Sequence, residues 1–197
     1  MNERSAYEVL MDYPKEKGLI YESHKSDTRF YLTPDDPMLN TKFVVFKINS
    51  SVFMAYDSYS TKAFMNQTFT GIYSISTLEK DFECEINKKY LLDNFRRNRK
   101  KTGNKYIDSN LTYISKSDKK VNEWLTEEIS SLFLELANTI QPIKILVKKD
   151  YLPLIKDFKT KNIIGIETNQ WIYKKEEIDI LINSGAEIIR KLNKTSR

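Results

Sequence analysis

The chain has 197 residues and a formal net charge of +5, with 32 basic residues set against 27 acidic ones, and 40% of its residues are hydrophobic. This composition is far from that of a disordered chain and leaves enough apolar residues for an ordinary buried core. The single cysteine excludes an internal disulfide, and no apolar run approaches the roughly 18 residues of a membrane span, so we expect a soluble, cytoplasmic protein.

The first half of the chain is predicted to begin with a helix and to continue mainly in strands. Residues 5–13 have an amphipathic helical pattern, which Pro14 is expected to end, and residues 19–22 are predicted to be extended. Residues 42–48 and 51–56 are rich in Val, Phe, Ile and Tyr, and only two residues separate them. This arrangement predicts a β-hairpin.

Two more strands are predicted at residues 71–76 and 78–86. In the second strand, Phe82, Cys84 and Ile86 alternate with acidic residues and should face the core. The acidic face holds Glu79, Asp81, Glu83 and Glu85. Four acids at this period would suit a metal ion or a basic partner, but the solvent-exposed face of a half-buried strand is the interpretation that we favour.

A helix is then predicted from Lys88 to about Arg99. Asn87 is its candidate N-cap, and its inward face would hold Leu91, Leu92 and Phe95. The predicted helix ends in a dense basic run, and the charged members of this run are Arg96, Arg97, Arg99, Lys100 and Lys101. A helix dipole explains one or two cations at such an end but not five, so these five residues are the candidates for contact with a partner or a phosphate. The interpretation that we favour is a solvent-exposed helix end, and the alternatives are contact with a protein or membrane surface and contact with nucleic acid.

A long amphipathic helix is predicted at about 118–139, after a strand at 109–115. Its apolar residues recur at steps of three and four, and they are Val121, Trp124, Leu125, Ile129, Leu132, Phe133 and Leu136. Ser117 or Asp118 would cap this helix, and Pro142 would block its continuation. We expect it to be the central packing element of the second half.

The remaining segments complete an α+β pattern. Strands are predicted at 143–148 and 162–167, an edge strand or bulge at 151–156, and a terminal helix at about 174–193. The order of elements predicts a mainly antiparallel sheet with amphipathic helices packed on it.

The domain prediction is a single compact unit. It spans residues 1–197, and the alternative is two subdomains, a strand-rich 1–87 and a helix–sheet 88–197. Residues 1–197 are about the length of one ordinary domain.

From Thr102 onward the chain resembles a loosely defined family of uncharacterised bacterial proteins. The family pattern is Thr-Gly-Asp, two residues, Phe-Asp, two residues and Phe, followed by a strand, a long helix, further strands and a terminal helix. The matching residues are Thr102-Gly103-Asn104, Ile107-Asp108 and Leu111. Asn replaces the first Asp, and Ile and Leu replace the two Phe. The resemblance implies the fold of the second half and no activity.

Candidate catalytic and metal-binding residues are few. His24 is the only histidine and lies in a polar stretch, so we interpret it as a surface residue. Asp35, Asp36 and Asp57 would suit Mg²⁺, but acids beside prolines usually form turns. Cys84 is predicted to be a buried apolar residue rather than a reactive thiolate. We therefore predict no catalytic residue, no metal ligand and no cofactor.

The sequence favours a non-enzymatic function in protein binding or regulation. In this hypothesis the partner is another protein. One alternative is association with nucleic acid through the run from Arg96 to Lys101. A second alternative is an unrecognised metal-dependent hydrolase. Neither the partner nor the oligomeric state follows from the sequence.

Overall fold

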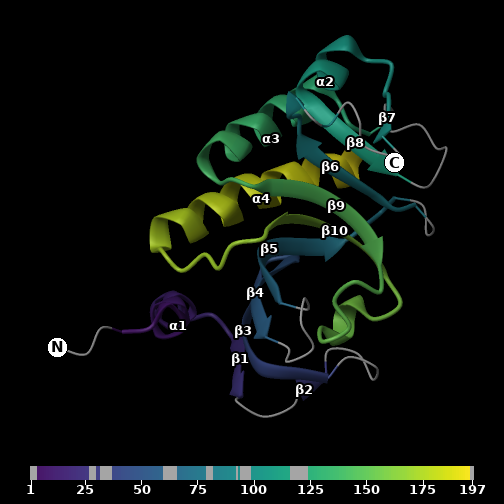
Figure 1. Cartoon of the computed structure of the whole chain (residues 1–197). Helices are drawn as coiled ribbons and strands as arrows, with labels where there is room; N and C mark the ends of the chain where they lie inside the picture. The colour runs from purple at the N-terminus through teal and green to yellow at the C-terminus, as the bar shows by residue number, and fades with distance from the viewer. Residues whose placement is uncertain are drawn as a thin grey trace.

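A computed structural model gives the fold (Figure 1). It describes residues 4–26, 30–31, 37–59, 66–78, 82–91, 93, 99–115 and 124–195. The strands in these ranges are β1 (Tyr21–Ser26), β2 (Phe30–Tyr31), β3 (Pro37–Ile48), β4 (Ser51–Tyr59), β5 (Gln67–Ile75), β6 (Cys84–Lys88), β7 (Arg99–Lys100), β8 (Leu111–Ser115), β9 (Ile143–Lys149) and β10 (Asn162–Thr168). The helices are α1 (Ala6–Glu16), α2 (Lys105–Asn110), α3 (Glu127–Thr139), the 3₁₀ turn η3 (Lys156–Phe158) and α4 (Lys175–Thr195).

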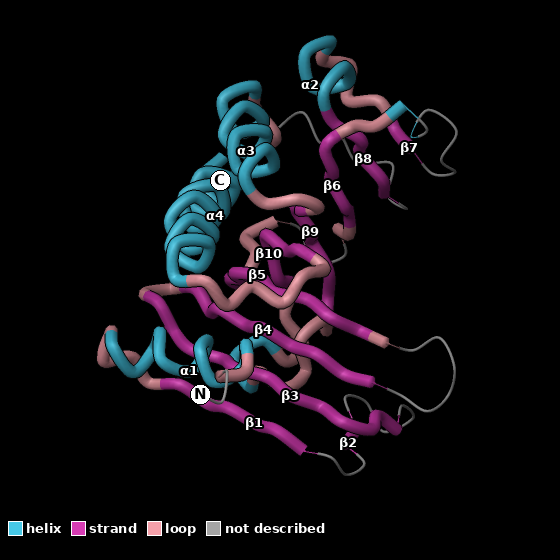
Figure 2. The backbone as a smooth tube through the Cα atoms, turned by 60° about the vertical axis from the view of Figure 1, so that its left-hand side comes forward, coloured by secondary structure: helices cyan, strands magenta, loops and turns pink. Residues whose placement is uncertain are grey.

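The strands form one curved antiparallel sheet, which confirms the predicted fold class. Their order is β1-β3-β4-β5-β10-β9-β6-β8-β7, and β2 pairs with β3 beside this path (Figure 2). The predicted hairpin is present as β3 and β4, which meet at Ile48 and Ser51. Asn49 adopts a positive φ of 53° in the turn, a conformation that Asn tolerates better than most residues. The predicted boundary between residues 87 and 88 falls inside β6.

One face of the sheet is covered by helices. α3 and α4 lie side by side on it, and α1 covers the part formed by β1, β3 and β4 (Figures 1 and 2). Phe133 from α3 and Ile182 from α4 join Ile145 of β9 in one buried cluster. α1 is held to α4 by Tyr13, whose hydroxyl donates to Asp179 Oδ1 at 2.6 Å. This face therefore holds the main core, as the amphipathic helices require.

The opposite face is covered in part by an irregular segment, residues 150–161, which we call the strap. Leu152, Ile155 and Phe158 of the strap are buried in a second apolar cluster. The cluster's sheet residues include Met54 of β4 and Leu146 of β9. The predicted strand at 151–156 is therefore wrong, because these residues turn through η3 and place apolar side chains on the sheet without joining it.

The long helix predicted at 118–139 ends where expected, but within the described residues it begins only at Glu127. Thr126 caps it by accepting a hydrogen bond from the Ile129 N–H, and Trp124 and Leu125 precede it as buried, non-helical residues. Residues 118–123 lie outside the described ranges. The terminal helix predicted at 174–193 is confirmed by α4.

The helix predicted from Lys88 to Arg99 is wrong at both ends. Lys88 ends strand β6, and Arg99 begins strand β7. Leu91, predicted to face inward, is 91% exposed. Pro14 also fails to end the first helix, since α1 continues through it to Glu16.

Candidate functional site

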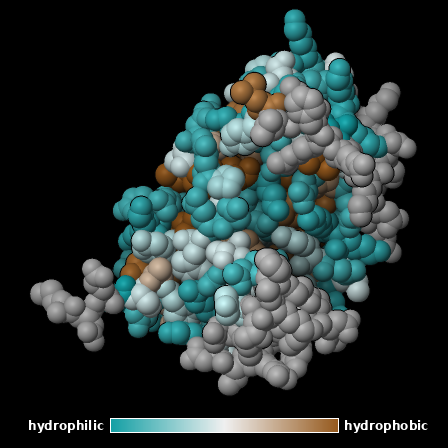
Figure 3. Space-filling model, viewed as in Figure 1, coloured by the Kyte–Doolittle hydropathy of each residue, from teal (hydrophilic) through white to brown (hydrophobic). Residues whose placement is uncertain are grey.

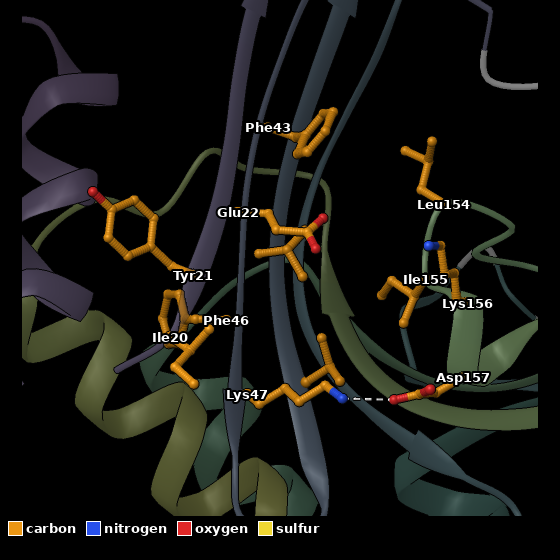
Figure 4. A pocket seen from close by; sticks show the side chains of 12 residues that line it. Ile20, Tyr21, Glu22, Phe43, Phe46, Lys47, Leu154, Ile155, Lys156 and Asp157 are labelled. Carbon is orange, nitrogen blue, oxygen red and sulfur yellow. Dashed lines mark hydrogen bonds and ion pairs between the residues drawn. The ribbon is translucent and has the colours of Figure 1, made fainter. Parts of the chain in front are cut away.

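A groove lies on the strap side of the sheet, between the strap and the end formed by β1, β3 and β4 (Figure 4). Its volume is about 390 Å³. Phe43 and Val45 of β3 and Val52 of β4 form its floor, and Leu154 and Ile155 of the strap form its far wall. These side chains make the groove mainly apolar.

The apolar floor follows from the sequence of β3. Residues alternate between the two faces of a strand, so Val44 and Phe46 point to the helices while Phe43 and Val45 point to the groove. The strand is thus apolar on both faces. The strap does not extend over the whole of the second face, and Phe43 and Val45 stay half-buried.

An exposed ion pair crosses the mouth of the groove. Lys47 Nζ of β3 lies 2.6 Å from Asp157 Oδ2 of the strap (Figure 4). This hydrogen bond raises the pKa of Lys47 and lowers the pKa of Asp157. Because both groups are in water, the pair adds little to stability, and it marks the place where the strap meets β3.

Strand β1 forms one edge of the described sheet, and its first two residues, Tyr21 and Glu22, line the groove. It pairs with β3 on one side only, so in an edge strand of this kind every second backbone N–H and C=O points outward. Glu22, Ser23 and Lys25 are exposed along it. Ile20, which immediately precedes β1 and lines the groove, is 90% exposed.

The strap is anchored at its other end by a buried polar cluster around Glu167 of β10. The Glu167 carboxylate accepts hydrogen bonds from Tyr73 Oη at 2.7 Å and from Tyr151 Oη at 2.9 Å, and Lys144 Nζ lies 3.1 Å from it. Burial, and then the nearby carboxylate, raise the pKa of Tyr73 and of Tyr151. Since Glu167 is only 3% exposed, this cluster holds the strap on the sheet rather than offering an open site.

The basic run is placed only in part. Arg96 and Arg97 lie outside the described residues. Arg99 and Lys100 form β7 and pair with Ile114 and Tyr113 of β8, while Lys101 is exposed just after it. The prediction that Arg99 and Lys100 end a helix is wrong, and contact with a partner or a phosphate stays a prediction.

The other candidates of the sequence have protein partners or lie outside the described residues. Asp57 accepts a hydrogen bond from Thr68 Oγ1 and pairs with Lys42 Nζ at 3.2 Å. Glu85 pairs with Lys148 at 2.6 Å, and the His24 ring stacks on Phe43. Asp35, Asp36, Glu79 and Asp81 are not described.

The described residues contain no cluster of three or more His, Cys, Asp or Glu side chains placed to hold a metal ion. In the same ranges no helix is both long enough and apolar enough to cross a membrane.

The Thr102-Gly103-Asn104 motif has a structural explanation. The Asp108 carboxylate accepts hydrogen bonds from the Thr102 N–H at 2.8 Å and from the Gly103 N–H at 3.1 Å. The Asn104 side chain caps α2 by accepting from the Tyr106 N–H at 2.9 Å, and Gly103 has a φ of 84°. The motif therefore builds a turn and a helix cap.

Sequence reasoning missed the groove and the strap. The available signal was that residues 43–46 are apolar on both faces of the strand, which is unusual for a strand with one solvent-exposed face. A second signal was Pro153 among the apolar residues Leu152, Leu154 and Ile155. This segment is apolar, but its proline has no N–H to donate to a neighbouring strand. In comparisons with protein-family models, with curated proteins and with solved structures, no match to this chain was found.

Proposed function

We propose that this protein binds an extended segment of another protein, which adds to the sheet at the outer edge of β1. The observation that carries the proposal is the apolar groove of about 390 Å³ directly beside an edge strand. An added strand would lie about 4.8 Å from β1, so its side chains would reach the groove. In this mode of recognition the backbone supplies affinity and the groove selects side chains.

Exposed apolar surface at this place supports the proposal. Ile20 is almost fully exposed at the start of β1, while Phe43 and Val45 are only half-buried beside it. Elsewhere, on the face seen in Figure 3, hydrophilic residues dominate and hydrophobic atoms appear in small separate areas. Covering the groove with a bound side chain would remove apolar surface from water, which gains roughly 25 cal/mol for each Å².

A selection from a library of random displayed peptides tests the proposal. We expect enriched peptides whose affinity falls about tenfold or more when Ile20→Gln and Val45→Gln are combined, since tenfold corresponds to only about 1.4 kcal/mol. Leu91→Gln is the matched control for Ile20→Gln, because Leu91 is as exposed as Ile20 and follows β6, which is far from β1 in the strand order.

The outcome depends on which variants affect binding. Peptides that lose affinity in the double variant and keep it in Leu91→Gln support the groove as the binding site. If no peptide is enriched, or if the enriched peptides bind both variants equally well, the proposal is wrong. Circular dichroism of each variant establishes that a loss of binding is not a loss of fold.

A further inference from the structure

Strand β1 carries two opposite charges, one on each of its faces. Glu22 lies on the groove face, because its register partner on β3 is Val45, which lines the groove. Its side chain projects toward the groove in Figure 4. Lys25 follows three residues later and therefore lies on the opposite face, in register with Lys42.

These two charges are available to a partner. Both residues are exposed, and among the described residues neither side chain makes a hydrogen bond or an ion pair. The neighbouring charges are already paired, Lys47 with Asp157 at 2.6 Å and Lys42 with Asp57 at 3.2 Å. The edge therefore presents a negative charge toward the groove and a positive charge toward the helix face. Lys47 is close enough to attract Glu22, and Glu8 of α1 is close enough to attract Lys25, but neither interaction is a hydrogen bond or an ion pair.

We propose that the partner segment runs antiparallel to β1 and carries an acidic residue, a large apolar residue, any residue and a basic residue in that order. This inference rests on the proposed function and specifies the chemistry of the partner. The acidic residue would lie opposite Lys25 and the basic residue opposite Glu22, since opposite charges across strands attract and like charges repel. Antiparallel pairing is favoured because it is the slightly more stable arrangement and every described strand pair of this sheet adopts it.

The apolar position follows from His24. Its ring stacks on Phe43 with a centroid distance of 5.4 Å, and Phe43 forms part of the groove floor. A side chain opposite His24 points to the same face and can extend over that floor. The aliphatic stem of the basic residue would cover apolar surface beside it while the charged end reaches the Glu22 carboxylate.

Swapping the acidic and basic residues, in the peptide and separately in the protein, tests this order. The first probe is a fluorescent peptide, Thr-Val-Thr-Glu-Leu-Thr-Lys-Val-Thr, and the second has its Glu and Lys exchanged. Fluorescence anisotropy gives their affinities for the natural protein and for the double variant Glu22→Lys with Lys25→Glu. Both positions are exposed, so the variant should fold normally, and its thermal unfolding is measured alongside.

We expect the natural protein to bind the first peptide about tenfold more tightly than the second, and the double variant to reverse this preference. The difference should shrink as salt is added, because the pairs are exposed. If both peptides bind both proteins equally and still depend on Ile20 and Val45, the charge order is wrong while the groove remains the site. If neither peptide binds the natural protein, the charge order is wrong; if the peptide library also yields no ligand, the proposed function fails with it.

Discussion

Glu167 is a buried carboxylate whose partners come from three separate parts of the chain. Tyr73 of β5, Tyr151 of the strap and Lys144 of β9 all reach it. The Tyr73 ring lies across Gly71, where an added Cβ would stand 2.5 Å from the tyrosine oxygen. The glycine thus makes room for a large side chain to lie flat on the sheet, and the carboxylate fixes that side chain by its hydroxyl.

Replacing Tyr73 with Phe should lower the free energy of unfolding by about 1.5–3 kcal/mol, the usual value of a hydrogen bond to a charged group. The carboxylate would keep Tyr151 and Lys144 but lose a buried donor. Urea unfolding followed by circular dichroism measures the effect. Tyr173→Phe is the control, because Tyr173 is exposed and its loss of a hydroxyl should cost almost nothing. Equal stabilities of the two variants would show that the cluster is not holding the sheet and strap together.

The same cluster predicts a loss of stability in alkali. Burial, with a smaller contribution from Glu167, raises the pKa of Tyr151 above its usual value of about 10. Below about pH 10 the hydroxyl is protonated in both the folded and the unfolded chain, so its stabilising contribution is fully present. Above that pH the unfolded chain releases the proton first, which favours unfolding.

The free energy of unfolding should therefore fall as the pH rises above about 10, and it should fall less steeply in Tyr151→Phe. Comparing the variant with the natural protein removes the contribution of the lysines, which titrate in the same range. Urea midpoints at several pH values give both slopes. Identical slopes would mean that Tyr151 is not protected in the folded protein.

At the scale of elements, α3 packs on the core through Ile129, Phe133 and Leu136, and Phe133 is the largest of these side chains. Phe133 is fully buried in the main core, whereas Leu132, which the helical spacing also placed on the inner face, is only half-buried. We expect Phe133→Ala to cost about 3–5 kcal/mol and Leu132→Ala less than about 2 kcal/mol. Thermal and urea unfolding of the two variants, with exposed Glu135→Ala as a control, test this order. A larger loss for Leu132→Ala would mean that α3 is rotated on its axis.

Strand β6 supplies a second test at this scale. Cys84 is buried on the core face, as the alternation with Phe82 and Ile86 predicted, and burial raises the pKa of its thiol. It should react slowly with a thiol reagent until the protein is unfolded. The variant Asn183→Cys adds an exposed thiol on α4. In this variant the introduced thiol should react fast with the reagent, and the Cys84 thiol should react slowly. Two fast equivalents would show that β6 has a different register.

The sequence predicted most elements whose local and long-range preferences agree. β3 and β4 were found from their composition, and α4 from its apolar spacing, because the same residues also suit their places in the core. The predicted start of α3 is too early because Trp124 and Leu125 continue the apolar spacing of the helix. Thr126 followed by two glutamates is the stronger start signal, and it is the one that the structure uses.

The failures come from contacts between distant segments. Leu91, Leu92 and Phe95 have helical spacing. Residues 84–87 pair with both β8 and β9, however, and Lys88 pairs with β8, so this pairing extends the strand. The groove was missed for a related reason. Its floor comes from residues 43–52 and its wall from residues 154–155, and nothing local indicates that the two segments face each other.

At the scale of the whole molecule, the groove results from uneven coverage of one long sheet. Helices cover one face along much of its length, while the strap covers only part of the other face (Figures 1 and 2). On this face the strap extends as far as β3, where Asp157 pairs with Lys47, and the sheet continues beyond β3 to β1. Among the described residues an apolar strip and an open strand edge therefore lie next to each other, and the proposed strand addition rests on this arrangement.

Residue-resolved amide hydrogen exchange, with and without a peptide selected against the protein, tests strand addition most directly. In the free protein the outward N–H groups of β1 should exchange quickly, because an edge strand leaves every second one in water. Bound peptide should slow exchange at alternate residues between Tyr21 and Ser26 and leave the amides of α3 and α4 unchanged. Protection that falls on the helices or on β7 instead, with β1 exchanging as fast as before, would contradict strand addition at this edge.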